Sequence, residues 1–278
     1  MNIHWFPGHM TKALRQLEIS LKTVDFVVYI VDSRAPWSCQ NPAFDKLLSN
    51  FPVIYVLNKC DFGDLAICQK WINTKTQENI EVICTNSRKN NLNKLVVASI
   101  NRVCRAKLDK FKSKNINVGL RGIVVGVPNV GKSTFINSIA RSKKAKTGDV
   151  PGVTRGQQCI KINEYLELQD TPGTLYPKLN DENVAINLAL IGSIRDQVLD
   201  ITELSHRLIE KLQIYDCSIL YNLCECSPTV TPSQVLSQFA AKRGFVLKGG
   251  LLDIDRAASG LIDEFRKGKL GKITLDSP

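Results

Sequence analysis

The sequence has no run of about 18 to 20 uncharged apolar residues, the length that a membrane-spanning helix requires. Its first residues, Met1 to His4, do not begin a signal-peptide pattern. We therefore expect neither a membrane protein nor a membrane partner. A chain of 278 residues can form one large domain or two ordinary ones.

Metal-binding and disulfide patterns are also lacking. The nine cysteines are odd in number, and the nearest pair, Cys224 and Cys226, is a CxC with no second pair. This usage indicates reduced thiols and a cytoplasmic location, rather than a disulfide framework or a zinc site. His4 and His206 carry no motif of their own, and we interpret both as structural or surface residues.

Acidic residues are nearly absent from one segment. Residues 101–147 contain 12 Lys and Arg against a single acid, Asp109, whereas residues 178–278 contain 12 Lys and Arg against 13 acids. The whole formal charge of +11 therefore lies in the first of these segments. A solvated helix face with a basic loop would explain a shorter run, but this density favours an anionic partner, most commonly nucleic acid. Phosphate contacts would then supply affinity without sequence preference.

Short apolar runs that end in polar residues are present throughout the first part of the chain. They lie at 24–31, 53–57, 80–85, 122–126 and 165–169. Helical patterns lie between them at 11–22, 42–50, 64–77, 91–112 and 132–140. This alternation predicts an α/β fold with a doubly wound, mostly parallel sheet, which binds ligands at the carboxyl ends of its strands.

The character of the sequence changes after Gly173. Four helical patterns follow, at 183–192, 196–212, 232–243 and 254–267. The third begins with Thr231, Pro232 and Gln234, a capping box with proline at the first helical position. We predict a domain at 1–177 and a small, mainly helical domain at 178–278.

GVPNVGKS, residues 126–133, follows a predicted strand and opens a predicted helix, as a phosphate-binding loop requires. Lys132 would reach the β- and γ-phosphates, and the Ser133 hydroxyl would bind Mg²⁺. The helix dipole and the backbone N–H groups add to the phosphate site. The predicted phosphate-binding residues are Asn129, Val130, Gly131, Lys132, Ser133 and Thr134.

Two further segments suit the γ-phosphate and its metal ion. Asp170 begins a DTPG string at a strand end, where its carboxylate can hold Mg²⁺ through water and the Gly173 N–H can meet the γ-phosphate. Thr154 lies in a loop rich in Gly and Pro and could give Mg²⁺ a second hydroxyl, although an ordinary surface threonine is the alternative.

NKCD, residues 58–61, predicts guanine as the base. The Asp61 carboxylate can accept from the guanine N1–H and 2-amino group, whereas adenine would leave it unpaired. Asn58 would bind the far side of the base and hold the phosphate loop, and the Lys59 stem would cover the base face. Asn86 and Ser87 could offer a backbone N–H to the guanine O6. GTP and GDP are therefore favoured over adenine nucleotides.

The order of these motifs is unusual. A Ras-like GTPase runs from phosphate loop to DxxG to NKxD, whereas here NKCD comes first and DTPG last. The cyclic order of the motifs is the same, but the chain begins at a different element. We therefore predict a circularly permuted Ras-like domain. The helical pattern at 91–112 would join the old termini. DTPG leads directly into the C-terminal helices, so movement linked to the γ-phosphate could pass to them.

This order, with WFPGHM at 5–10, DSRAP at 32–36 and GGLLDIDRAA at 249–258, resembles the circularly permuted ribosome-assembly GTPases. The resemblance covers the whole chain and extends to the bacterial ribosome biogenesis GTPase A family with its mitochondrial relatives. It implies a GTP hydrolase that binds the large ribosomal subunit precursor through rRNA and assists late maturation. Residues 1–177 would then be the GTPase domain with its N-terminal arm, and the helical domain at 178–278 would bind RNA or the ribosome. DNA is not an implied partner, and we expect a monomer.

The same resemblance implies details of catalysis. Hydrolysis would be assisted by K⁺, with Asn129 helping to hold the ion. Thr174 stands where a Ras-like enzyme has the glutamine that orients water, so another residue is needed. His9 is the candidate catalytic residue, together with Lys132 and Gly173. The alternative is that His9 only packs the N-terminal arm onto the sheet.

Two other functions fit the same residues. The chain could be a passive RNA-binding module with GTP as a structural ligand, in which case the Mg²⁺ and γ-phosphate residues need not be intact. It could also be a GTPase that acts on a different RNA or on a membrane. The absence of an apolar span argues against the membrane.

Overall fold

The computed structural model describes residues 8–87, 92–114, 119–140, 159–171, 173, 181–225 and 230–276, with the side chains of α1 described from residue 14. Its central sheet has the order β3-β2-β1-β4-β6-β5. The strands are β1 (Phe26–Asp32), β2 (Val53–Asn58), β3 (Ile80–Thr85), β4 (Leu120–Val125), β5 (Cys159–Asn163) and β6 (Leu166–Asp170). Five strands are parallel and β5 pairs antiparallel with β6, which confirms the predicted fold class.

The middle strands are buried on both faces. Every residue of β1, FVVYIVD, and of β2, VIYVLN, is buried. Near-continuous apolar runs of this kind are typical of parallel strands covered by helices on both sides. Because β1, β2 and β4 run in the same direction, the polar residues that follow them gather at one edge of the sheet.

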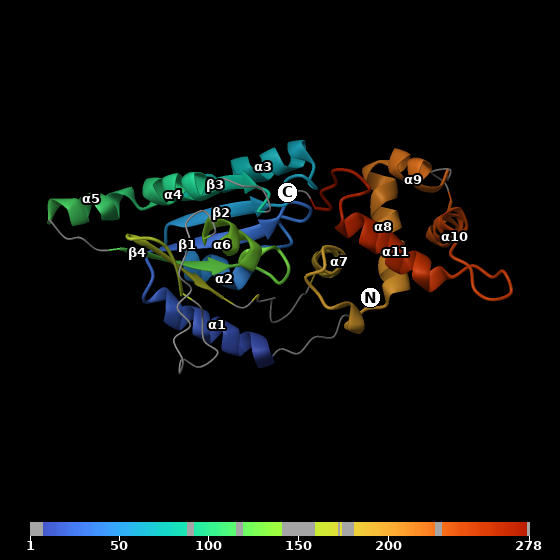
Figure 1. Cartoon of the computed structure of the whole chain (residues 1–278), viewed down its shortest axis with the longest axis horizontal. Helices are drawn as coiled ribbons and strands as arrows, with labels where there is room; N and C mark the ends of the chain where they lie inside the picture. Colours follow the sequence, from blue (N-terminus) through green and yellow to red (C-terminus); the bar gives the residue numbers. More distant parts are fainter. Residues whose placement is uncertain are drawn as a thin grey trace.

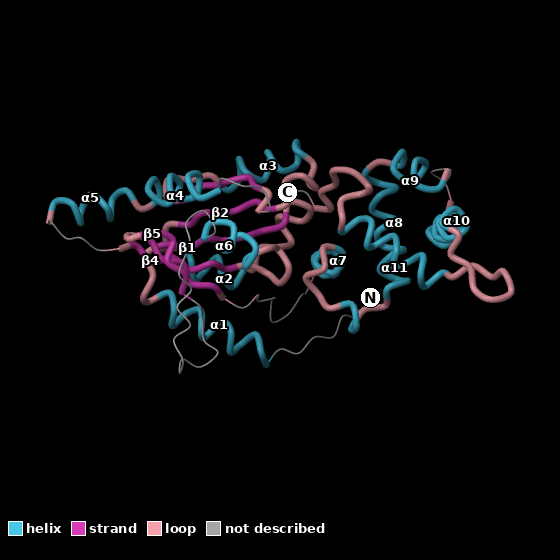
Figure 2. The backbone as a smooth tube through the Cα atoms, viewed as in Figure 1, coloured by secondary structure: helices cyan, strands magenta, loops and turns pink. Residues whose placement is uncertain are grey.

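Helices cover the sheet in two layers (Figures 1 and 2). In this view α1 runs along one side and α3, α4 and α5 along the other, where α4 also contacts α6. These helices are α1 (Gly8–Leu21), α2 (Pro42–Leu48), α3 (Leu65–Lys75), α4 (Leu92–Val103), α5 (Arg105–Ser113) and α6 (Lys132–Ala140). The predicted single helix at 91–112 is thus two helices separated at Cys104.

The C-terminal helices form a second group beside the sheet (Figure 1). They are α7 (Glu182–Leu190), the short 3₁₀ helix η1 (Asp196–Val198), α8 (Ile201–Tyr215), α9 (Cys217–Cys224), α10 (Pro232–Arg243) and α11 (Ile254–Arg266). α8 packs against α9, α10 and α11. The predicted division of the chain at residue 177 lies outside the described residues and stays a prediction.

The last residues return from the helical group to the sheet. Ile273 N–H donates to the Phe62 carbonyl at 2.9 Å, and Leu275 N–H donates to the Arg34 carbonyl at 2.7 Å. Thr274 accepts from the Asp64 N–H through its hydroxyl at 3.0 Å. The C-terminal segment therefore packs directly on the loops that follow β1 and β2.

No helix in the described part of the chain has both the length and the apolar character to span a membrane. The eight cysteines in the same part are free thiols.

Candidate nucleotide-binding site

A cavity of about 210 Å³ opens at the carboxyl edge of the sheet, between the ends of β2, β3 and β4. The residues around it come from the NKCD segment, the loop after β3, the phosphate loop and the end of α11. They are Asn58, Lys59, Asp61, Phe62, Asn86, Ser87, Asn129, Gly131, Thr134 and Arg266. The structure thus brings together eight of the residues predicted to bind the nucleotide, although they are far apart in the sequence.

The phosphate loop connects β4 to α6 through three residues with positive φ. These are Gly126 (φ 150°), Asn129 (φ 61°) and Gly131 (φ 101°). A Cβ at Gly126 would lie 2.4 Å from the Ile30 carbonyl oxygen, and one at Gly131 would lie 2.4 Å from the Asn58 Nδ2. Only glycine fits both conformations, so the two glycines of the motif are required by the backbone path itself.

Asn58 joins the NKCD segment to both neighbouring loops. Its Nδ2 donates to the Val130 carbonyl at 2.7 Å. Its Oδ1 accepts from the Ser87 N–H at 3.0 Å and from the Ser87 hydroxyl at 2.8 Å. The predicted tie between Asn58 and the phosphate loop is present. Because the side chain is buried, these bonds fix the relative position of the three loops.

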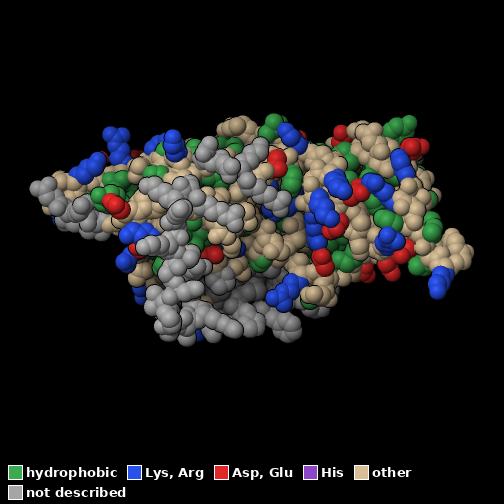
Figure 3. Space-filling view, viewed as in Figure 1, with side chains coloured by type: hydrophobic (Ala, Val, Ile, Leu, Met, Phe, Trp, Pro, Cys, Tyr) green, Lys and Arg blue, Asp and Glu red, His purple; other side chains and the backbone are tan. Residues whose placement is uncertain are grey.

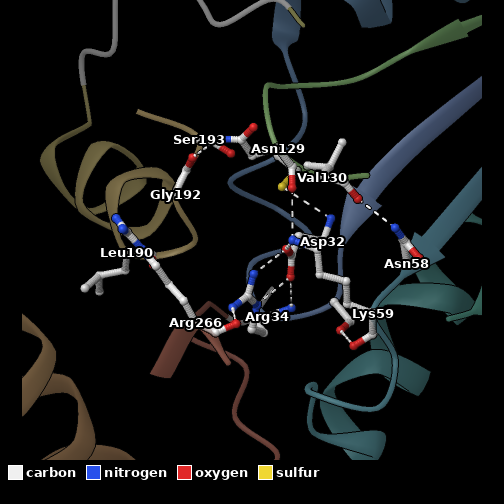
Figure 4. Close-up of polar contacts among 12 residues, drawn as sticks. Asp32, Arg34, Asn58, Lys59, Asn129, Val130, Leu190, Gly192, Ser193 and Arg266 are labelled. Carbon is white, nitrogen blue, oxygen red and sulfur yellow. Dashed lines mark hydrogen bonds and ion pairs between the residues drawn. The ribbon is translucent and has the colours of Figure 1, made fainter. Parts of the chain in front are cut away.

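Lys59 spans the cavity toward β1 (Figure 4). Its Nζ donates to the Asn129 carbonyl at 2.9 Å and pairs with the Asp32 carboxylate at 2.8 Å. Asp32 is fully buried and also receives two bonds from the Arg34 guanidinium, at 2.9 and 2.7 Å. Burial raises the pKa of Asp32, but the charges and hydrogen bonds of Arg34 and Lys59 outweigh it and hold the pKa well below its usual value.

Asp32, Arg34 and Arg266 were not predicted as site residues. In the sequence, Asp32 and Arg34 stand at a strand end, within the DSRAP segment at 32–36. The sequence pattern that could have identified Asp32 and Arg34 is an acid and an arginine at the end of an apolar strand, where buried charges must be paired. Arg266 comes from a helix 205 residues beyond Asp61, and no local pattern could have assigned it to this cavity.

Lys132 begins α6 and is buried at the phosphate end of the site. Its Nζ donates to the carbonyls of Gly126 and Val127, each at 3.0 Å. Burial lowers the pKa of Lys132 to about 8, and the nearby Asp170 charge opposes that shift. Among the described residues only backbone carbonyls accept hydrogen bonds from this buried ammonium, which suits it to an incoming anion.

Gly173 lies against the phosphate loop. A Cβ at this position would be 2.8 Å from both the Lys132 Nζ and the Pro128 Cα. The Thr171 hydroxyl donates to the Val124 carbonyl at 2.6 Å and ties the same segment to β4. Only a residue without a side chain allows the DTPG segment this approach.

Asp170 and Ser133 form a pair that fits a hydrated cation. The Ser133 hydroxyl donates to the Asp170 Oδ2 at 3.3 Å. The Asp170 Oδ1 is buried and has no hydrogen-bond partner among the described residues. A carboxylate oxygen without a partner beside a hydroxyl suits Mg²⁺, which prefers oxygen ligands and keeps several waters.

Two of the predicted residues lie outside what the structure describes, and a third, Asn129, lies within it. Thr154 lies outside the described residues, and the side chain of His9 lies outside the described part of α1. Asn129 donates from Nδ2 to the Gly192 carbonyl at 2.6 Å, and its amide oxygen has no hydrogen bond to a described residue. That oxygen is a group that K⁺ could use.

The sheet order, the phosphate loop between β4 and α6, and the NKCD segment beside that loop define a P-loop GTPase. Its motifs are circularly permuted, since the base-specific segment precedes the phosphate loop in the chain. A family model described as "50S ribosome-binding GTPase" matches residues 121–223.

Full-length relatives extend this match. The chain is 38% identical to "Ribosome biogenesis GTPase A" of Priestia megaterium, over 100% of this chain and 98% of that protein. It is 32% identical to the protein of the same name from Thermotoga maritima, over 99% and 94%. It is also 32% identical to "Mitochondrial ribosome-associated GTPase 1" of Mus musculus, over 98% and 89%. The chain belongs to the ribosome biogenesis GTPase A family and is a GTPase, as the sequence predicted.

Solved structures agree with this assignment. The GDP-bound YlqF of T. maritima superposes with a TM-score of 0.69 at 28% identity, covering 95% of this chain and 99% of that chain. The GNP-bound form superposes with a TM-score of 0.67 at 28% identity, covering 96% and 98%. Both are similar to this chain across the GTPase domain and the C-terminal helices.

Proposed function

We propose that this GTPase binds the precursor of the large ribosomal subunit through rRNA and assists its late maturation, with hydrolysis stimulated by the particle. The names of its relatives and of the matching family model support a ribosomal partner. The observation that carries a guanine-nucleotide cycle is the set of bonds from Asn58 to Val130 and Ser87, which joins base recognition to phosphate binding.

At the base, Asp61 would accept from the guanine N1–H and 2-amino group. Asp61 is exposed at the rim of the cavity, where it can meet an entering base. The Lys59 stem would cover one face of the base, and a backbone N–H of Asn86 or Ser87 would meet O6. A carboxylate in this place rejects adenine, because it would then be left without donors.

At the phosphates, the N–H groups from Asn129 to Thr134 would surround the β-phosphate at the start of α6. Lys132 would exchange its two carbonyl partners for β- and γ-oxygens. In hydrolysis, water attacks the γ-phosphorus and the bond to the β–γ bridging oxygen breaks, so charge grows on the β-phosphate. Lys132 stabilises that charge, and the Gly173 N–H would hold a γ-oxygen.

Bound Mg²⁺ would neutralise charge on the β- and γ-phosphates, and its ligands would be Ser133, Thr154 and Asp170, the last through water. The Asn129 amide oxygen would help to hold K⁺. His9 would orient or activate the attacking water, the task for which Thr174 is poorly suited. These roles of Thr154 and His9 rest on the sequence.

The rRNA contact is proposed for the basic segment. Helix α5 has no buried residue, and its Arg105, Lys110 and Lys112 side chains point to solvent. It extends beyond the sheet in Figure 1, and Figure 3 shows Lys and Arg side chains over this end of the molecule. An exposed basic helix of this kind suits the phosphate backbone of RNA.

Sedimentation with purified ribosomal subunits tests this function. We expect the protein to pellet with large subunits in the presence of a non-hydrolysable GTP analogue, to dissociate in GDP, and to bind small subunits weakly in both states. Equal binding to both subunits, independent of the nucleotide, would favour the passive RNA-binding module. Binding to neither subunit, with intact GTP hydrolysis, would favour a GTPase that acts on a different RNA. The protein is proposed to act as a cytoplasmic monomer.

A further inference from the structure

A ring of polar contacts, closed through the backbone between Leu190 and Gly192, joins the nucleotide cavity to the C-terminal helices (Figure 4). Four members come from the end of β1 and the loops at the same edge of the sheet, and two come from the C-terminal part of the chain. They are Asp32, Arg34, Lys59, Asn129, Gly192 and Arg266.

On the sheet side, the ring holds the lysine of the NKCD motif in one place. The Lys59 Nζ lies between the Asp32 carboxylate at 2.8 Å and the Asn129 carbonyl at 2.9 Å. Asp32 itself is fixed by the bidentate contact with Arg34 and by the Arg34 N–H at 3.1 Å. Since Asp32 is fully buried, it has little freedom to give Lys59 another position.

Arg34 then reaches the end of α11. Its Nη1 donates to the Arg266 carbonyl at 3.0 Å, and its guanidinium lies over the Phe62 and Phe265 rings at 5.7 and 5.5 Å. The Arg34 side chain is buried, so it contacts both parts of the molecule without water between them. Phe62 directly follows Asp61, the proposed guanine-binding acid.

Arg266 connects the end of α11 to the end of α7. Its Nε and Nη2 donate to the carbonyls of Leu190 and Ala189 at 3.1 and 2.9 Å, and its guanidinium pairs with Asp196 at 2.7 Å. A cation on the last carbonyls of a helix satisfies groups that would otherwise lack donors. Arg266 therefore fixes the end of α7 relative to α11.

The residues after α7 complete the ring at the phosphate loop. The Asn129 Nδ2 donates to the Gly192 carbonyl at 2.6 Å, and the Ser193 hydroxyl donates to the Pro128 carbonyl at 2.7 Å. Gly192 has a φ of 80°, a conformation that favours glycine. Two neighbouring residues of the phosphate loop thus contact the segment after α7.

We propose that this ring couples docking of the C-terminal helices to guanine-nucleotide binding, with Asp32 and Arg34 as positioning residues for Lys59. The inference rests on the proposed binding of guanine by Asp61 and Lys59. A base that packs on the Lys59 stem stabilises the ring, and the ring in turn fixes the α7 and α11 ends. Because such coupling is reciprocal, weakening the docking must weaken nucleotide affinity.

The affinity for fluorescent GDP, measured without ribosomes, tests the coupling. We expect Arg266→Gln to weaken GDP binding about fivefold, within the range of measured coupling between residues of one polar network. The matched control is Arg243→Gln, which removes an arginine that also pairs with α11, through Glu264, but lies outside the ring. The control should bind GDP as the unaltered protein does.

A double-mutant cycle tests whether Asp32 acts through Lys59. Asp32→Asn should weaken GDP binding about tenfold alone, yet less than about twofold in a Lys59→Met background. Equal effects in the two backgrounds would contradict the positioning role. Should Asp32→Asn fail to fold, Arg266→Gln, which changes a partly exposed side chain, still tests the coupling.

Hydrogen exchange gives a readout that a purely structural role would not change. GDP should slow amide exchange at 186–193 and 266–276 in the unaltered protein, and this protection should be lost in Arg266→Gln. Unchanged GDP affinity in Arg266→Gln, with protection equal to that of the unaltered protein, would overturn the inference. If the unaltered protein failed to bind GDP, the proposed function itself would be wrong.

Discussion

Asn58 shows how single side chains build this site. It uses both ends of its amide, donating to the phosphate loop and accepting from Ser87, so it is a structural link between the two loops besides its predicted contact with the base. Gly131 lies so close to it that an added Cβ would be 2.4 Å from its Nδ2. Asp61, by contrast, lies exposed at the cavity rim, where specificity can be changed without disturbing this packing.

Replacement of Asp61 by asparagine should change the base preference. Guanine would lose the carboxylate that accepts from N1–H and the 2-amino group, whereas xanthine has an oxygen at position 2 that the new amide can donate to. We expect Asp61→Asn to lose GDP affinity by about 100-fold and to gain xanthosine diphosphate affinity. Competition binding with both nucleotides measures this. Unchanged GDP affinity would contradict the role of Asp61.

Lys132 should make nucleotide binding depend on pH. Burial lowers its pKa to about 8 in the free protein, so it begins to lose its charge near that pH. Phosphate oxygens favour the charged form and raise the pKa, so binding takes up a proton. The affinity for GDP should therefore fall up to about tenfold per pH unit as the pH rises above about 8. Titration calorimetry in two buffers would detect the uptake, and a flat profile would contradict it.

Among the elements, buried strands were the most predictable. The apolar runs that predicted the five parallel strands match β1, β2, β3, β4 and β6 within two residues at each end. β5 was missed because it is an edge strand whose sequence, CIKIN, has one buried residue, Ile162. Edge strands need little apolar content, so they leave a weak pattern.

The observed helix ends lie at residues that cap helices. The capping box at Thr231 is present, with Gly244 in the left-handed conformation at the other end of α10. The predicted helix at 196–212 was wrong at its start, because Asp200 caps α8 through the Glu203 N–H and leaves only η1 before it. The short helix α9 was missed, since its eight residues leave too short a pattern.

For the exposed helix α5, the prediction concerns binding to the ribosomal particle. Replacing its basic residues with glutamine should weaken binding to the ribosomal particle and reduce the salt dependence of that binding. The slope of log affinity against log salt concentration should fall by about one unit per lost phosphate contact. GDP affinity should not change. The residues to replace are Arg105, Lys110 and Lys112 of α5 and Lys114, which directly follows the helix, whereas Lys107 is kept because it pairs with Asp25.

A control set should carry the same charge change elsewhere on the surface. Four exposed lysines serve this purpose: Lys22, Lys46, Lys70 and Lys161. If both sets weakened binding equally, the contribution of α5 would be one of overall charge and not of position.

At the scale of the whole molecule, the C-terminal segment ties the helical group to the GTPase domain. Its residues 273–276 contact the loops after β1 and β2 through backbone bonds and the Thr274 hydroxyl. This return could not be predicted, because a short extended segment has no periodicity and its partners are fixed only by the tertiary fold. The same holds for Arg266, whereas the motif residues around the cavity were all found from spacing and strand ends.

Asp276 should make that docking sensitive to pH. It accepts from the Ser38 N–H at 2.6 Å, and burial raises its pKa to about 6. A raised carboxyl pKa favours the protonated form in the folded state, so this stability is present at low pH and lost as the pH rises through about 6. Relative to the unaltered protein, Asp276→Asn should gain about 1–3 kcal/mol of stability between about pH 5 and pH 7.5. Urea unfolding at the two pH values tests this, and a constant difference would contradict it.

The circular permutation determines how the DTPG segment is connected to the C-terminal helices. The DTPG segment ends at Gly173, and no strand of the sheet follows β6 among the described residues. Contacts from Asn129 and Pro128 to the residues after α7 place these helices against the phosphate loop. A partner that binds the helices would thus be connected to the phosphate loop through these contacts.

The most direct measurement is the steady-state rate of GTP hydrolysis in potassium buffer, alone, with purified large ribosomal subunits and with unrelated RNA. We predict a slow rate alone, a large stimulation by large subunits and little effect of other RNA. A rate that stayed the same with the subunits, while RNA binding persisted, would contradict the account and favour a passive module with GTP as a structural ligand.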